Sequence, residues 1–217
     1  MKILAIDTST DYLSVAVRDG DRIVACYHRP SHRNHSRLLV PTIAGLVKKA
    51  RLKLRDIDAF AVSVGPGSFT GLRIGVVTIK GLTYSTGKPA IAVPTMDVIA
   101  RNAKEFNGIV CPVMDAKKNK VYACLYRSKG GTFKKLTKYL LLPVDELLKM
   151  TAKYDKVLFL GDGVNMAGAA ESVKDWYPKA SVVSALAAES FRKKKFLSPE
   201  KLEPMYIYSS ECDIKGI

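Results

Sequence analysis

The stretch SVGPGSFTGLRIG, residues 63–75, places four glycines and a proline between two apolar runs. A strand, a glycine-rich turn and a helix N-terminus in this order can bind a phosphate group. The spacing matches neither common phosphate motif, because no lysine follows Gly71 and the third glycine of the dinucleotide pattern comes one residue late. The stretch therefore predicts a sharp turn from a strand (59–64) into a helix (70–86). Gly71 and Gly75 share a face that another helix could approach, and a small anion at the helix N-terminus stays an open alternative.

Three short strands precede this stretch. They cover residues 2–7, 12–19 and 22–28, and tight-turn residues separate them, which predicts an antiparallel meander. A helix follows over residues 36–54. One face of that helix is apolar at Leu39, Ile43 and Leu46.

The same order of elements begins again near residue 107. Three strands are predicted at residues 109–116, 120–128 and 132–141. They are followed by a predicted helix, strand, helix, short strand and helix, at residues 144–153, 156–163, 165–177, 180–185 and 186–196. The chain is therefore predicted to be an α/β protein with two similar lobes, residues 1–107 and 108–217. Each lobe should contain a mixed sheet that starts with an antiparallel three-strand meander.

Two lobes of this kind resemble the actin, sugar-kinase and Hsp70 superfamily, whose ribonuclease H-like lobes hold ATP between them. The resemblance identifies Asp7, Thr8 and Ser9 as the first nucleotide turn and Asp115 as part of the matching turn of the second lobe. Neither turn contains the glycine that would let the backbone approach a phosphate. We therefore expect these four residues to be the remnant of a nucleotide site, in a fold that has lost its ATPase chemistry.

Composition restricts the partners and surroundings of the chain. It has 217 residues and a formal net charge of +15, which favours an acidic partner such as nucleic acid. The densest basic runs lie at residues 191–196 and 47–55, where a solvated surface and an RNA-facing patch are alternatives. No apolar run reaches the roughly 18 residues of a membrane span, and the four cysteines contain no CxxC pair. A cytoplasmic protein with reduced thiols and no membrane contact is expected.

Candidate chemical groups do not form a recognisable site. His28, His32 and His35 lie in one predicted loop, where Pro30 interrupts the spacing of a metal pair. The possible nucleophiles Ser63, Ser68, Thr70 and Cys111 lack a GxSxG motif. The sequence therefore predicts no catalytic residue, no metal and no cofactor, and nothing in it selects a catalytic triad.

Five segments in order carry a specific resemblance: ILAIDTST, HSRLLVPTI, GPGSFTGLRIG, MDAKKNKVYACLY and EPMYI. With them the chain resembles the TsaB (YeaZ) family of tRNA threonylcarbamoyladenosine biosynthesis over nearly its full length. Many members have Pro-x-Tyr-x-Arg near the end, whereas Tyr208 takes the place of the arginine in this chain.

The resemblance implies a non-catalytic subunit that dimerises with TsaD, the metal-dependent transferase that places threonylcarbamoyl on N6 of the adenosine beside the anticodon. It also implies a complex with the ATPase TsaE, contact with tRNA through the complex, and a possible homodimer of the isolated chain. The metal histidines of TsaD lie on a helix in a His-x3-His motif, and the matching helix here, residues 37–54, is expected to contain no histidine.

The expected partner surface lies on the first-lobe helices and the glycine-rich turn. Its predicted residues are Leu39, Ile43, Leu46, Ser68, Phe69, Thr70, Arg73 and Val77. Two other functions remain alternatives: an ATP-dependent kinase-like enzyme of the same superfamily and a metallopeptidase-like protein. The sequence leaves open whether this subunit touches tRNA directly and whether a nucleotide binds at the partner interface.

Overall fold

The computed structural model describes residues 1–166 and 175–207. Two compact units divide the chain: Met1–Val98 with Tyr177–Met205, and Ile99–Trp176 with the residues from Tyr206 onward. Residues 177–205, which the sequence groups with the second lobe, thus belong to unit 1. They do so because helix α5 (Ala180–Arg192) lays Ala180, Val183 and Ala187 against the first sheet.

Unit 1 is built on a five-stranded sheet with the order β3-β2-β1-β4-β5. Its strands are β1 (Lys2–Asp7), β2 (Tyr12–Asp19), β3 (Arg22–Pro30), β4 (Ala59–Gly65) and β5 (Ala90–Pro94). The first three pair antiparallel, as the meander predicts, and β4 and β5 continue the sheet in parallel from β1. Every residue of β4 is buried, as expected for a strand covered on both faces.

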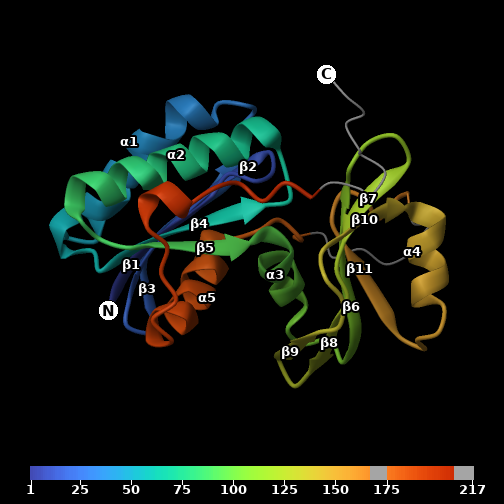
Figure 1. Cartoon of the computed structure of the whole chain (residues 1–217). Coiled ribbons are helices and arrows are strands. Elements are labelled where there is room, and N and C mark those ends of the chain that lie inside the picture. The colour runs from blue at the N-terminus through green and yellow to red at the C-terminus, as the bar shows by residue number, and fades with distance from the viewer. Residues whose placement is uncertain (167–174, 208–217) are drawn as a thin grey trace. The chain divides into compact units, whose positions relative to one another are not determined.

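Helices cover both faces of this sheet (Figure 1). Helices α1 (His35–Lys49) and α2 (Phe69–Thr86) lie side by side over one face, and α5 lies over the other. Helix α1 is shorter at its C-terminal end than the predicted 36–54, and Pro41 lies inside it without ending it. Its residues Leu39 and Ile43 join the core between α1 and the sheet.

Unit 2 contains a second sheet with the order β10-β7-β6-β8-β9, and β11 pairs in parallel with β6. Its elements are α3 (Thr95–Ala100, which begins in unit 1), β6 (Gly108–Asp115), β7 (Lys120–Ala123), β8 (Tyr126–Lys129), β9 (Thr132–Lys135), β10 (Leu140–Pro143), α4 (Val144–Thr151) and β11 (Val157–Leu160). Short 3-10 turns lie at Leu54–Asp56, Arg101–Ala103 and Pro199–Lys201.

The second meander is present, but two of its predicted strands are interrupted. Strands β7 and β8 pair with β6 in one continuous antiparallel register, and they separate opposite Pro112. Proline has no N–H to donate to the ladder, which explains the gap. The third predicted strand is divided into β9, which pairs with β8, and β10, which pairs with β7. The pairing register shifts by two residues between Lys135 and Leu140, which explains the break.

One predicted strand is wrong. Residues 180–185 form the first turns of α5, because Ala180, Val183 and Ala187 recur at helical spacing and pack on the sheet as one stripe. The helix predicted at residues 165–177 lies mostly outside the described residues. Within the described ranges, no helix is both long and apolar enough to span a membrane.

Candidate functional site: the glycine-rich turn and the α1–α2 surface

The glycine-rich stretch forms the predicted turn between β4 and α2. Strand β4 ends at Gly65, whose φ of 119° lies in a region that side-chain-bearing residues rarely adopt. Ser68 caps α2, since its Oγ accepts a hydrogen bond from the Gly71 backbone N–H at 3.2 Å. The Gly65 N–H donates to Thr95 Oγ1 at 3.1 Å, which ties the end of the strand to α3.

The chain's own first turn fills this stretch. The Thr8 hydroxyl donates to the Gly71 carbonyl at 2.7 Å, and the Ser68 N–H donates to the Ser9 carbonyl at 2.8 Å. A Cβ on Gly71 would overlap the Thr8 carbonyl oxygen, and one on Gly75 would overlap the Thr8 hydroxyl. The idea that these two glycines face a partner helix is therefore wrong, because they face the turn between β1 and β2.

Asp7 lies at the centre of this contact and is fully buried. Its Oδ1 accepts hydrogen bonds from the Ser9 backbone N–H at 3.0 Å and the Ser9 hydroxyl at 2.9 Å, while its Oδ2 has no hydrogen-bond partner. Burial raises the pKa of Asp7 from 3.8 to about 6, and the hydroxyls of Ser63 and Ser9 partly offset that rise. The Ser63 Oγ is also buried and makes no hydrogen bond of normal geometry.

The four residues predicted as a nucleotide remnant divide between the two units. Asp7, Thr8 and Ser9 are all fully buried and hold the glycine-rich turn. Asp115 lies in unit 2, where its carboxylate accepts a hydrogen bond from the Lys117 backbone N–H at 2.7 Å and pairs with the Lys117 ammonium at 2.6 Å. Those hydrogen bonds lower the pKa of Asp115.

Three of the predicted partner residues are part of the core. Leu39, Ile43 and Leu46 expose 1%, 4% and 8% of their surface and pack in the cluster between α1 and the sheet. Their assignment as partner contacts is wrong, because the apolar stripe of α1 is covered by the chain's own sheet.

The remaining predicted partner residues lie on the outside of unit 1. Ser68, Phe69, Thr70, Arg73 and Val77 are all exposed. The Arg73 guanidinium stacks over the Phe69 ring at 3.9 Å, and Val77 exposes 66% of its surface.

Two further exposed apolar side chains lie on α1 and α2, and neither is among the predicted partner residues. Tyr84 exposes 62% and Val40 on α1 exposes 60%. Tyr84 follows Val77 by seven residues, so helical spacing continued along α2 would have found it. Val40 lies next to the core stripe of α1 and carries no such signal. We call Val40, Phe69, Arg73, Val77 and Tyr84 the α1–α2 surface.

The histidines correct one expectation. His35 is the first residue of α1 and is buried, with a ring nitrogen 3.2 Å from the Ser31 hydroxyl, so the first helix does contain a histidine. The residue four positions later is Leu39, a core residue, which means that no His-x3-His pair forms on this helix. Among the described residues, no three His, Cys, Asp or Glu side chains gather into a possible metal site.

The possible nucleophiles are dispersed. Ser63 and Cys111 are buried in different units, and burial raises the pKa of the Cys111 thiol. Ser68 is engaged as the α2 cap, and Thr70 lies exposed one residue into the helix. Among the described residues, none of these possible nucleophiles is assembled with a base. What the described part of unit 1 presents is an exposed surface that could bind a partner.

Comparison with known proteins identifies relatives of this chain, one of them over its full length. Residues 29–203 match the TsaD family, described as tRNA N6-adenosine threonylcarbamoyltransferase. The protein named tRNA threonylcarbamoyladenosine biosynthesis protein TsaB from Bacillus subtilis is 31% identical over 227 residues, covering 100% of this chain and 98% of that protein. The protein of the same name from Escherichia coli is 37% identical over 134 residues, which are 60% of this chain and 58% of that protein.

A solved structure gives the same result. YeaZ from Pseudomonas aeruginosa matches with a TM-score of 0.83 and 25% identity, over 95% of this chain and 99% of that chain. This match and the two mixed sheets confirm the predicted fold class. Sequence and fold together show that the chain belongs to the TsaB (YeaZ) family.

Proposed function

We propose that this chain takes part in the synthesis of threonylcarbamoyladenosine in tRNA, as a non-catalytic subunit that pairs with the transferase TsaD. The names of its relatives from B. subtilis and E. coli support the pathway, and the first of them aligns with the entire chain. In this proposal TsaD transfers the group to N6 of the adenosine beside the anticodon. The ATPase TsaE joins the complex, and this chain contacts tRNA through the complex as a whole.

The α1–α2 surface is the observation that carries the pairing. Phe69, Val77 and Tyr84 expose 54%, 66% and 62% of their surface along one face of α2, and Val40 adds an apolar side chain from α1. Large apolar side chains that are exposed along one helix face are typical of a protein interface. Gly81 has open space where a Cβ would stand, so a partner helix could approach α2 closely there.

The filled first turn supports a non-catalytic role. Two N–H groups of the turn, those of Ser68 and Gly71, already donate to acceptors within the chain. Asp7 is fully buried, so its carboxylate cannot reach a nucleotide or a metal in this conformation. The same contacts argue against the small anion that the sequence left open at the start of α2.

Co-purification of this chain with TsaD tests the pairing. We expect a 1:1 complex by size-exclusion chromatography with light scattering, and we expect the double variant Arg73→Glu/Val77→Glu to abolish it. Val24→Glu is a matched control, because Val24 is a 42% exposed valine on β3 of the same unit. Any homodimer of the isolated chain should depend on the same two residues.

Two results would contradict the proposal. A complex that survives Arg73→Glu/Val77→Glu as well as Val24→Glu would show that the interface lies elsewhere. Turnover of ATP by the isolated chain, or chelator-sensitive cleavage of a protein substrate, would favour the kinase or the peptidase over a non-catalytic subunit.

A further inference from the structure

A pocket of about 670 Å³ in unit 2 gathers positive charge at the end of the second sheet. Three basic side chains line it, Arg127, Lys129 and Lys156, against one acidic side chain, Asp155. Among the described residues, none of the three cations forms an ion pair. The pocket therefore presents a local excess of positive charge to solvent.

The strand register explains why two of these cations share a face. Strands β6 and β8 pair antiparallel with Ile109 opposite Arg127, and directly opposite residues project to the same side of a sheet. Lys129 lies two residues beyond Arg127 and so projects to that side as well. The floor of the pocket is thus the nearly buried side chain of Ile109, flanked by two cations.

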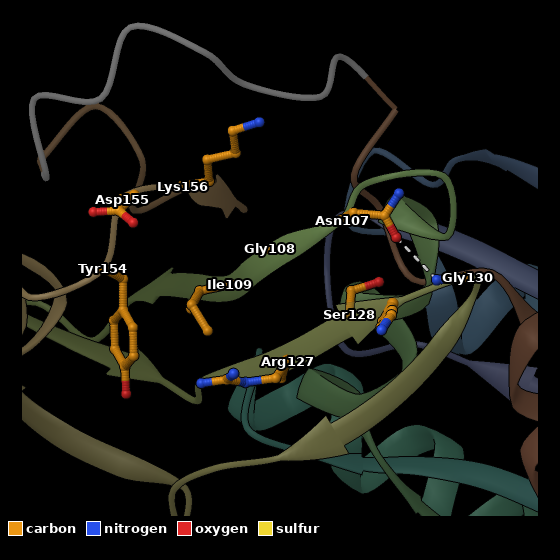
Figure 2. Close-up of a pocket in the computed structure, with 10 residues that line it drawn as sticks. Asn107, Gly108, Ile109, Arg127, Ser128, Gly130, Tyr154, Asp155 and Lys156 are labelled. Atoms are coloured by element: carbon orange, nitrogen blue, oxygen red, sulfur yellow. Dashed lines mark hydrogen bonds between the residues drawn. The ribbon is translucent and has the colours of Figure 1, made fainter.

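The other wall comes from the segment before β11. Val157, the first residue of β11, pairs in parallel with Ile109 along the edge of β6 that does not pair with β8. Tyr154 and Lys156 come just before Val157 in the chain, so they line the pocket at the same end of the sheet. Figure 2 shows the Arg127 side chain extending from β8 toward the Tyr154 side of the pocket, near Ile109. The Tyr154 side chain is half-buried and lines the pocket, so an aromatic ring borders the charged opening, with the Lys153 ammonium 5.4 Å from the ring centroid.

We propose that this pocket binds one nucleotide of a single-stranded RNA segment. The phosphodiester contacts Arg127, Lys129 and Lys156, and the base stacks on the Tyr154 ring. Proteins bind single strands by this combination of a cationic groove and an aromatic stacking surface. The volume lies within the range of roughly 300–1,000 Å³ for small-ligand sites.

The surrounding chain adds to the attraction. The hairpin from Tyr126 to Lys135 carries Arg127, Lys129, Lys134 and Lys135 and no acidic residue. A run of cations on neighbouring strands attracts a polyanion over several ångströms and raises its association rate. An acidic peptide would meet the same charges, but it would gain little from the Tyr154 ring, and this difference decides between the two ligands.

Fluorescence anisotropy with a labelled single-stranded RNA of about ten nucleotides, titrated with the full-length chain, tests the proposal. We expect Arg127→Glu/Lys129→Glu to weaken binding at least about tenfold and to reduce the salt slope by about 0.7, since the one phosphodiester that these cations share counts as a single phosphate contact. Tyr154→Leu should weaken binding about fivefold or more, with little change in the salt slope. The melting temperature of each variant reports whether it is folded.

A matched control reverses two charges elsewhere. Lys193→Glu/Lys195→Glu reverses two exposed lysines of the FRKKKF run after α5, and we expect less than about a threefold loss, as for distant surface charges. An equal loss in this control, or wild-type binding that does not saturate, would overturn the pocket. Full binding by Tyr154→Leu, or equal competition by polyglutamate, would overturn the nucleotide as the ligand.

The choice of RNA rests on the proposed function, but the two fail separately. Binding is measured with this chain alone, without TsaD and without the modification reaction. If the pocket variants bind RNA as well as the wild-type chain, the proposed pairing with TsaD is unaffected. If the chain does not co-purify with TsaD, the RNA titration still decides whether Arg127, Lys129 and Tyr154 bind RNA.

Discussion

Replacing Asp7 by asparagine should change how the stability of this protein depends on pH. Asparagine keeps an oxygen that can accept the Ser9 hydrogen bonds, and its amide can donate to the buried Ser63 hydroxyl, which makes no hydrogen bond of normal geometry in the wild-type chain. It differs from aspartate chiefly in that it never carries charge. The pKa of Asp7 is raised from 3.8 to about 6 by burial, so the wild-type chain must bury a charge at neutral pH.

The sign follows from proton linkage. A raised pKa means that folded Asp7 binds its proton more tightly than unfolded Asp7, so this group favours the folded state below its unfolded pKa and stops doing so as pH rises through about 6. A shift of about two units corresponds to about 3 kcal/mol, of which about 2 kcal/mol is lost between pH 4.5 and 8. The stability gained by Asp7→Asn should therefore grow by about 2 kcal/mol over that range.

Urea unfolding of both proteins at several pH values measures this difference, and the other titrating groups cancel between them. Carbon-13 NMR of the Asp7 carboxyl gives the midpoint directly. A stability difference that stays constant with pH to within about 0.5 kcal/mol would refute the reasoning. So would an NMR midpoint at the ordinary value of 3.8. Either result would mean that water reaches the carboxylate inside the first turn.

Two further predictions compare matched positions by urea unfolding. Gly71→Ala should lower the free energy of unfolding by about 1–3 kcal/mol, because its Cβ would overlap the Thr8 carbonyl oxygen. Gly81→Ala on the same helix has open space and should be neutral or stabilising by up to about 1 kcal/mol, so equal losses at both positions would contradict the packing. Leu39→Ala should cost about 2–5 kcal/mol and Val40→Ala less than about 0.5 kcal/mol, since these neighbours on α1 are 1% and 60% exposed. Similar costs at the two positions would contradict the division of α1 into a core face and a partner face.

Local patterns in the sequence predicted most of the elements. The strand, turn and helix around Gly65 and Ser68 follow from residue types within a few positions of each other, and so does the antiparallel meander of unit 1. Residues 180–185 are an exception. The β-branched pair Val182 and Val183 suggests a strand, whereas packing of a longer stripe on the sheet makes the segment helical.

Contacts between distant segments could not be read from the sequence. The spacing of Gly71 and Gly75 indicates that another part of the molecule approaches α2 closely. That part is Thr8, which lies more than sixty positions earlier in the chain. The stripe at Leu39, Ile43 and Leu46 likewise shows an apolar face without saying what covers it. Periodicity identifies faces, and only the fold decides between a core and an interface.

Reconstituted threonylcarbamoylation of tRNA tests the central claim most directly. TsaD, TsaE and the enzyme that supplies the threonylcarbamoyl donor are incubated with tRNA, with and without this chain, and modified adenosine is measured by mass spectrometry. We predict that modification requires this chain. The Arg73→Glu/Val77→Glu variant should fail to support modification, whereas the Val24→Glu variant should support it. Equal modification in the presence and absence of the chain would contradict the account.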